Sequence, residues 1–440
     1  MSACEYRGLA DDEWQHLNEI FPEPVLRWTK AGDCTLDGRK YDRVPLLLDI
    51  KGRVVDAPTS WFLHLTVSES APKTVAQYAY ALRIFWAFLG TTPWTSCDNT
   101  LLREWRNDMV AKGIGGQRAN DCIDAVVAFC RWAQDEGLTS GLVGATPEGG
   151  QPYPIRLVPG KGRRGKLVTN VRERAKRPPR LPVPDIEEMD QLYQRLTGPD
   201  EALSERNCLM ADMAVECGLR REEIVSLNKG DLASYGTIAE LRRMGKVARI
   251  EVTGKGNKAR IVPVLPELME KLQEHIRFHR KKLLGKTTRV EEAVFLSKKT
   301  GRRLTVWSVS RLFTKAFGSS NVQKLSLHRL RARYASLVVL TLARSEMRTR
   351  GLDEIRETFI LRAAADVLGH SDITTLSRYV DLAIRTLKAE VAGKAAPTDT
   401  LGVDAEVLAE VAHQNAGMHR SSKKPALSDS AKLARITKSL

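Results

Sequence analysis

Four short segments in the second half of the chain combine cations with imidazole or hydroxyl groups. In chain order they are CGLRREEIVSLNKGDL with Arg220, TGKGNKAR with Lys255, LSLHRLRARYAS with His328 and Arg331, and LGHSDITTLSRYV with His370 and Tyr379. Guanidinium groups bind anionic oxygens with forked hydrogen bonds. A tyrosine must lose its proton to act as a nucleophile, and a cationic pocket favours that loss. These residue types suit nucleophilic chemistry on an anionic group.

Each segment taken alone has an ordinary structural explanation. Most tyrosines on helices are packing residues with a polar tip, so Tyr379 could be one more buried ring. His370 could be a satisfied core histidine, and Lys255 is where any hairpin carries a soluble residue. No carboxylate pair, HExxH motif or Ser/His/Asp arrangement competes with these segments, and GKGNK lacks the spacing of a Walker loop. The joint occurrence of the four segments in this order favours a functional interpretation.

The composition indicates a polyanionic partner and a reducing compartment. The 440 residues predict two or three domains, and 69 Lys and Arg against 53 Asp and Glu give a net charge of +16. Such a charge favours nucleic acid first and a membrane surface second. The seven cysteines lack CxxC spacing, which argues against a disulfide framework and a zinc site. With no signal pattern and no apolar run that could span a bilayer, we expect a cytoplasmic protein.

The chain is predicted to comprise a leader, two domains, a linker and a tail. We expect a leader over 1–55, a helical domain over 56–145, a basic linker over 146–180, a second domain over 181–393 and a tail over 394–440. In the first domain, apolar residues spaced by three and four from Val75 to Leu89 predict an amphipathic helix. In the second, VARIEVTGKGNKARIVPV has the composition of a β-hairpin, and helices dominate to about residue 393.

The basic linker is a candidate DNA contact. Between Arg156 and Arg180 the sequence has ten Lys or Arg against a single acid, Glu173. A basic linker is commonly a solvated connection, but it can also lie along a phosphate backbone, where each neutralised phosphate adds salt-sensitive affinity. Both interpretations can hold together. The candidate DNA-binding residues are Lys161, Arg163, Arg164, Lys166, Arg172, Arg174, Lys176 and Arg177.

The four segments together resemble the tyrosine recombinase, or phage-integrase, family. The matching motifs are G-L-R-x-x-E-[IL] at 218–224, G-K-G-x-K-x-R at 254–260, H-x-L-R-x-x-x-A at 328–335, and L-G-H-S-x-I-x-T followed by a tyrosine at 379. The helix TVAQYAYALRIFWAFL is also similar to the first helix of the family's core-binding domain. The resemblance implies a mainly α fold (α+β) with a small antiparallel β-sheet in the catalytic domain, preceded by a helical, SAM-like core-binding domain that binds DNA.

The same resemblance implies a role for each candidate catalytic residue. Tyr379 would be the nucleophile that forms a 3′-phosphotyrosyl link to DNA, while Arg220 and Arg331 would hold the phosphate oxygens. His328 would accept or relay a proton, and Lys255 would protonate the departing 5′-oxygen. His370 would hydrogen-bond the phosphate, and Glu223 would brace the site rather than react. No cofactor, metal or ATP is then required, because the covalent link stores the energy of the broken bond.

Several functions remain open within this chemistry. The resemblance implies duplex DNA as partner and a tetramer on DNA, with an accessory protein or partner recombinase conceivable, in a bacterial, nucleoid-associated setting. The long leader and tail suggest a mobile-element integrase or transposase. The alternatives are a type IB topoisomerase-like enzyme and a non-catalytic DNA-binding protein of the same fold. The sequence between Arg331 and His370 is longer than in compact members and predicts an extra helical segment on the outside of the domain or against a neighbouring protomer.

Overall fold

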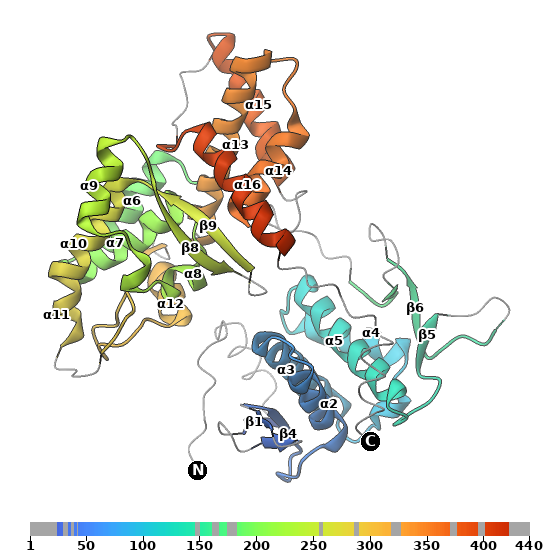
Figure 1. Ribbon diagram of the computed structural model, residues 1–440. Helices are drawn as coiled ribbons and strands as arrows, with labels where there is room; N and C mark the ends of the chain where they lie inside the picture. The colour runs from blue at the N-terminus through green and yellow to red at the C-terminus, as the bar shows by residue number, and fades with distance from the viewer. Residues whose placement is uncertain are drawn as a thin grey trace. The chain divides into compact units, whose positions relative to one another are not determined.

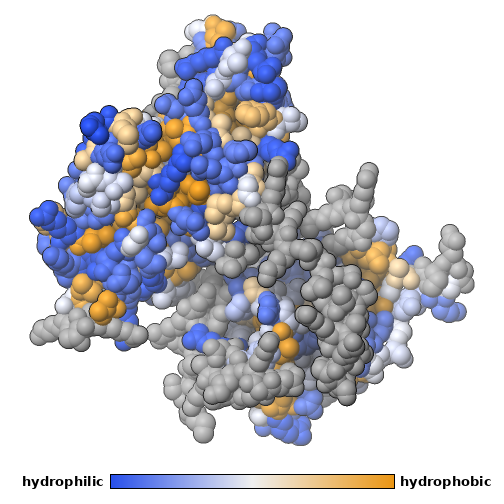
Figure 2. Space-filling view, in the orientation of Figure 1, coloured by the Kyte–Doolittle hydropathy of each residue, from blue (hydrophilic) through white to orange (hydrophobic). Residues whose placement is uncertain are grey.

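The chain divides into two compact units, Met1–Arg180 and Leu181–Leu440. The structure is a computed structural model (Figure 1) that describes residues 24–29, 34–36, 39–41, 43–145, 150–160, 167–173, 183–254, 258–285, 290–317, 327–369, 376–394 and 401–421. Within these ranges no helix is both long and apolar enough to cross a membrane. Hydrophilic residues cover most of the visible described surface, with apolar residues in small groups among them (Figure 2).

The first unit is built on helices that share an aromatic core. These are α2 (Asp56–Val67), α3 (Pro72–Leu89), α4 (Asn99–Ala111) and α5 (Gly116–Asp135), with a short 3-10 turn η1 (Trp94–Ser96). In the predicted stripe of α3, Val75, Leu82, Phe85 and Leu89 are buried and Tyr78 is partly buried, and Gly90 ends the helix with a φ of 58°. The rings of Trp61 and Tyr78 stack 5.1 Å apart within this core. Aromatic burial therefore stabilises this unit.

Two small antiparallel pairs precede these helices. Strand β1 (Val25–Trp28) pairs with β4 (Pro45–Leu48), and β2 (Cys34–Leu36) pairs with β3 (Arg39–Tyr41). Leu47 on β4 is fully buried in the core of the helices. The segment predicted as a leader thus contributes strands to the first unit.

The segment predicted as a basic linker contributes two strands to a sheet in the first unit. Strands β6 (Ile155–Pro159) and β7 (Leu167–Thr169) lie in this segment and form one sheet with β5 (Val143–Ala145), which ends the predicted helical domain. The pairing is parallel between β5 and β6 and antiparallel between β6 and β7. Ile155 and Leu157 flank the exposed Arg156 and are buried in the core of the first unit. Two buried residues beside a basic run are a short signal, which explains why composition alone indicated an extended connection.

The second unit is mostly helical around one β-hairpin. Its helices before and after the hairpin are α6 (Ile186–Leu196), α7 (Glu201–Val215), α8 (Arg221–Ser226), α9 (Tyr235–Arg243), α10 (Pro266–Glu274), α11 (Arg280–Leu284), α12 (Val306–Phe317), α13 (Leu327–Arg350), α14 (Glu357–Leu368), α15 (Ser377–Val391) and α16 (Ala405–Ser421). A 3-10 turn η2 (Lys229–Asp231) and a π-helical turn η3 (His275–His279) complete the helical elements. Strands β8 (Ala248–Gly254) and β9 (Lys258–Val264) pair antiparallel. The predicted fold class, mainly α with a small antiparallel sheet, is confirmed.

Two regions of this unit differ from the sequence-based expectation. The extra helical segment is the long α13 together with α14, and its residues Val338, Leu342 and Ile360 are buried in the core rather than placed on the outside. The described part of the predicted tail also joins this core, because Leu408 and Val411 of α16 are fully buried. Figure 1 shows α16 lying along β9 and α14.

Candidate active site

The candidate site begins at the first turn of α8. Arg220 is the residue before the helix, and Glu223 reaches back to accept the backbone N–H of Arg220 at 2.7 Å and its Nη1 at 2.8 Å. Both hydrogen bonds run from Arg220 to the Glu223 carboxylate, and the first of them satisfies a free backbone donor at the helix start. The side chain of Glu223 is 1% exposed and that of Arg220 is 26% exposed. Glu223 therefore holds the Arg220 guanidinium in place while leaving part of it open to solvent.

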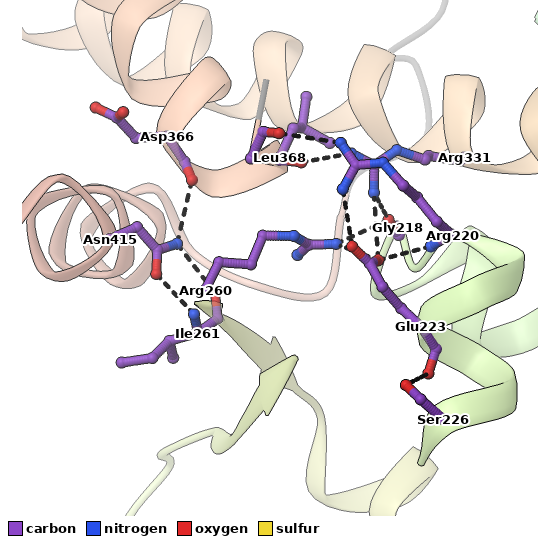
Figure 3. Close-up of polar contacts among 11 residues, drawn as sticks. Gly218, Arg220, Glu223, Ser226, Arg260, Ile261, Arg331, Asp366, Leu368 and Asn415 are labelled. Atoms are coloured by element: carbon purple, nitrogen blue, oxygen red, sulfur yellow. Dashed lines mark hydrogen bonds and ion pairs between the residues drawn. The ribbon is translucent and has the colours of Figure 1, made fainter. Parts of the chain in front are cut away.

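Two further arginines share the same carboxylate. Nη2 of Arg260 on β9 donates to Glu223 Oε2 at 2.7 Å, and Nη1 of Arg331 on α13 lies 3.9 Å from that oxygen. We call these four residues the arginine network: Arg220, Glu223, Arg260 and Arg331. Figure 3 shows their side chains converging from α8, β9 and α13. Three cations on one carboxylate leave an excess of buried positive charge, which favours an anionic ligand.

The electrostatics of the arginine network follow from this imbalance. Burial alone raises the pKa of the Glu223 carboxyl, but the charges of Arg260, Arg220 and Arg331 together with the Arg220 backbone N–H outweigh it, so that the pKa is lowered. Burial, followed by repulsion from Arg260 and Arg220, lowers the pKa of Arg331 to about 9. A phosphate oxygen beside these guanidiniums would relieve that repulsion.

Glycines of three motifs let the backbone approach the arginine network. Gly218 has a φ of +62° and its Cα faces the ring of Tyr334 so closely that a Cβ would overlap the ring. Gly369 has a φ of +63°, and a Cβ there would lie 2.7 Å from Cδ of Arg260. A Cβ on Gly254 would lie 3.1 Å from Glu223 Oε1. A positive φ and close approach are both conditions that glycine alone meets without strain.

Backbone carbonyls beside these glycines fix the arginines. The Gly218 carbonyl accepts a hydrogen bond from Nη1 of Arg331, and the Leu368 carbonyl accepts one from its Nη2. The carbonyl of Gly369 accepts from Nη2 of Arg220 at 3.0 Å. Arg220 and Arg331 are therefore tied to the end of α14 as well as to Glu223.

A pocket of about 450 Å³ opens beside the arginine network. Its lining includes three predicted catalytic residues, Arg220, His328 and Arg331, together with Leu219, Arg221, Glu222, Ser310, Phe313, Thr314 and Leu327. The imidazole of His328 retains solvent exposure. Its pKa is lowered first by partial burial and then by the charges of Arg331, Arg378 and others nearby. His328 is therefore neutral at neutral pH and able to accept a proton.

Tyr379 lies at the start of α15 with its ring buried and its hydroxyl bound to a cation. Only 6% of the residue is exposed, and it packs in the core formed by α13 to α16. Nη2 of Arg378 donates to the Tyr379 hydroxyl, and Cζ of Arg378 lies 4.5 Å from the ring centroid. Tyr379 is not among the described residues that line the pocket. Arg378 links Tyr379 to the pocket, because its charge also lowers the pKa of His328, which lines the pocket.

Several predicted site residues lie outside the described ranges. These are Lys255, His370, Lys161, Arg163, Arg164, Lys166, Arg174, Lys176 and Arg177. The described residues Gly254 and Gly369 immediately precede two of them and pack on the arginine network. Arg172 is described, and its Nη2 lies 3.3 Å from Asp124 Oδ2 in the first unit. That ion pair gives Arg172 a structural contact in addition to any role in binding DNA.

Two residues near the site were missed as candidates. Arg260 is the last position of the G-K-G-x-K-x-R motif, and that motif was the available signal. Arg378 directly precedes Tyr379, but a single arginine beside a tyrosine has no distinctive spacing. Only the fold shows that its guanidinium turns back onto the neighbouring ring.

Comparison with known proteins finds similarities that centre on the second unit. The model of the phage integrase family matches residues 185–385. Tyrosine recombinase XerD of Staphylococcus epidermidis is 32% identical over 203 residues, which cover 45% of this chain and 58% of the relative. Tyrosine recombinase XerC of Alcanivorax borkumensis is 25% identical over 316 residues, covering 71% of this chain and 84% of the relative. The chain thus spans less than two thirds of the length of the XerD relative.

Solved structures give weaker likenesses. A lambda integrase (75-356) dimer bound to a COC′ core site has 18% identity and a TM-score of 0.48, covering 74% of this chain and 95% of that one. XerH site-specific recombinase bound to palindromic difH substrate has the same identity and TM-score, covering 77% of this chain and 84% of that one. The family match at 185–385 contains the whole arginine network and Tyr379, and over those residues the chain is similar to the phage integrase family, the tyrosine recombinases.

Proposed function

We propose that this protein is a site-specific DNA recombinase that cleaves and rejoins strands through a 3′-phosphotyrosyl intermediate. The observation that carries the proposal is the convergence of Arg220, His328 and Arg331, from separate parts of the chain, on one pocket beside an uncompensated cluster of cations. The match to the phage integrase family over residues 185–385 supports the same proposal. The net charge of +16 suits a DNA substrate.

In the proposed reaction the pocket binds one phosphodiester of duplex DNA. Arg220 and Arg331 would hold the non-bridging oxygens, on which negative charge increases as the nucleophile adds. The hydroxyl oxygen of Tyr379 attacks phosphorus, its proton passes to His328, and the bond from phosphorus to the 5′-oxygen breaks. By family resemblance Lys255 supplies the proton to that 5′-oxygen, and His370 hydrogen-bonds the phosphate. Glu223 takes no part in bond breaking but holds the arginines.

Rejoining reverses these steps with a different strand. A 5′-hydroxyl from a second DNA site attacks the phosphotyrosine, phosphorus transfers to it, and the Tyr379 oxygen leaves and regains its proton. The phosphate ester bond is conserved throughout, so the reaction as proposed consumes neither ATP nor a cofactor. Because the same number of phosphodiester bonds exists before and after, strand exchange is close to balanced in energy.

The proposal extends to assembly and setting by family resemblance alone. We infer that the protein acts as a tetramer on two DNA sites, in DNA integration, excision or transposition, with an accessory protein or partner recombinase as a possible requirement of particular sites. The basic residues between Arg156 and Arg180 would contact phosphates and position the duplex rather than read bases. The inferred location is the bacterial cytoplasm at the nucleoid.

A strand-exchange assay tests this function against its alternatives. Two duplexes carrying DNA from the flanks of the gene, labelled with different fluorophores, are incubated with the protein in the presence of EDTA. Joint molecules carrying both labels are the expected product. Relaxation of supercoiled plasmid without joint molecules would indicate a topoisomerase-like enzyme. Salt-sensitive binding with neither product would indicate a DNA-binding protein that keeps only the fold.

A further inference from the structure

A buried asparagine on α16 hydrogen-bonds to the backbone behind the arginine network. Asn415 is fully buried and lies beyond the segment 185–385 that the family model matches. Its Nδ2 donates to the carbonyls of Ile261 at 3.0 Å and Asp366 at 3.1 Å, and its Oδ1 accepts from the Ile261 N–H at 2.7 Å. Figure 3 shows the amide between β9 and the end of α14. One side chain thus joins three separate elements.

These two backbone attachment points lie next to residues that hold the arginines. Ile261 directly follows Arg260, whose guanidinium bonds Glu223. Asp366 lies two residues before Leu368, whose carbonyl accepts from Arg331. A shift of β9 relative to α14 would therefore move the arginine network as well as the hydrogen bonds of Asn415.

The amide of Asn415 occupies the free edge of β9. The sheet has only two strands within the described residues, β8 and β9, so the outer edge of β9 has no strand partner there. Asn415 satisfies both the N–H and the carbonyl of Ile261, as a neighbouring strand would. Leaving such buried groups without partners costs about 1 to 3 kcal/mol each.

The position of α16 does not depend on this asparagine alone. Leu408 and Val411 are fully buried in the same core, and Arg249 Nη2 lies 2.6 Å from Glu410 Oε2. An apolar residue at 415 would keep the packed helix in contact while removing the link between β9 and α14. The polar bridge can thus be separated by experiment from docking of the helix.

We propose that Asn415 is a positioning residue that couples docking of α16 to the geometry of the arginine network. It touches no reacting atom, and its effect passes through Ile261 and Asp366 to Arg260, Arg220 and Arg331. This inference rests on the proposed function, because the readout is DNA cleavage. It makes α16 part of the catalytic apparatus in this chain.

The test compares Asn415→Leu with Glu410→Gln in the full chain. Leucine has the same branched skeleton as asparagine, although it is larger, and it removes all three hydrogen bonds, whereas Glu410→Gln removes a surface ion pair of α16 and keeps them. Under single-turnover conditions with saturating nicked DNA, we expect Asn415→Leu to form the covalent adduct about 10- to 100-fold more slowly, as small misplacements of catalytic groups do. Its Kd for DNA is expected to stay within about threefold of wild type, since the phosphate-binding cations remain. Glu410→Gln is expected to match wild type, as exposed ion pairs contribute little.

Asn415→Asp provides a readout that a purely structural role would not change. The carboxylate can accept from the Ile261 N–H but can donate to neither carbonyl, and once it is protonated its single O–H can donate to one of them. Beside those carbonyls and away from water, its pKa is expected to rise. Relative to wild type at each pH, cleavage by Asn415→Asp is therefore expected to improve from pH 8 to pH 6, while Asn415→Leu shows no such recovery.

Three outcomes would overturn the inference. If Asn415→Leu cleaved DNA at the wild-type rate, Asn415 would not couple docking of α16 to the arginine network. If Asn415→Leu lost DNA affinity and thermal stability along with its cleavage rate, Asn415 would be only a packing residue. A cleavage rate of Asn415→Asp that does not change with pH relative to wild type would lead to the same conclusion. A failure of the proposed function is distinguishable from these, because wild type itself would then form no adduct.

Discussion

The second unit contains two clusters of buried arginines, and only one of them has the features of a reactive site. In the first, Arg206 Nη1 donates to the Leu296 carbonyl at 2.7 Å and Arg280 Nε to the Ala293 carbonyl at 2.8 Å. His275 lies fully buried beside them, with its pKa lowered to about 4 by burial and by the charges of His279 and Arg206. None of these residues lines the pocket beside the arginine network.

The arginine network differs in access and in its partner. Arg220 and Arg331 both line a pocket, and three guanidiniums share the carboxylate of Glu223. In the Arg206 cluster, backbone carbonyls and the side-chain oxygen of Asn207 accept the hydrogen bonds of the guanidiniums. Burial of arginine is therefore not a sign of catalysis by itself. Access for an anion, combined with an excess of cations over carboxylates, is the distinguishing feature.

Replacing one arginine from each cluster should separate the two roles most clearly. We expect Arg220→Ala to slow formation of the covalent DNA adduct by a factor of about 100 to 1,000, as loss of one electrostatic donor does. Thermal stability should change little, because Arg220 is partly exposed. Arg206→Ala should instead lower the melting temperature and leave the cleavage rate of the folded protein near wild type. If both variants slowed cleavage equally, the two arginine clusters would not differ in role.

Neutralising Glu223 tests whether the shared carboxylate holds the arginines together. Glu223→Gln keeps the shape of the side chain and leaves three cations, two of them buried, without a counter-charge. We expect the free energy of unfolding at pH 7 to fall by about 3 to 5 kcal/mol, measured by urea denaturation. A loss below about 1 kcal/mol would contradict the proposed bracing role.

The pH dependence of that loss has a defined sign. Folding lowers the pKa of Glu223, so its stabilising contribution is fully present above the unfolded pKa of about 4.3. The contribution is lost as the pH falls through the lower folded value. The free energies of unfolding of wild type and Glu223→Gln should therefore differ most near neutral pH and become similar in acid. A difference in unfolding free energy that increased in acid would contradict the bracing role of Glu223.

The smallest effect is expected at Arg378, which lies between the pocket and Tyr379. Arg378 donates a hydrogen bond to the Tyr379 hydroxyl, the proposed attacking oxygen. Arg378→Gln should therefore slow cleavage about tenfold, in the range of one charge-assisted hydrogen bond. Arg385→Gln, an exposed arginine farther along α15, is the matched control. Equal cleavage rates in the two variants would exclude the contact as a catalytic aid.

Local motifs predicted more of this site than of its surroundings. The spacing of Arg220 and Glu223 is that of a helix start, so their contact follows from three residues of sequence. Gly218 and Gly369 are part of the sequence motifs. Only the fold shows why glycine is needed there, because Gly218 lies against Tyr334 and Gly369 lies against Arg260. Sequence spacing cannot show which distant backbone an interior side chain will reach.

The same limit explains why some regions of the fold differ from the sequence-based expectation. Asn415 lies 154 residues from Ile261 along the chain, and nothing in the sequence around it indicates a hydrogen bond to a strand edge. Strands β6 and β7 are short and lie among cations, so the two buried apolar residues of β6 gave little signal. Long-range packing decided both cases.

Covalent trapping tests the central claim most directly. Wild type and Tyr379→Phe are incubated with a nicked suicide substrate made from DNA flanking the gene, denatured, and any protein–DNA adduct is digested and mapped by mass spectrometry. The account predicts an adduct in wild type alone, attached at Tyr379, while both proteins bind the DNA with similar affinity. An adduct that persists in Tyr379→Phe or maps to another residue would contradict it, as would the absence of any adduct from DNA that wild type binds.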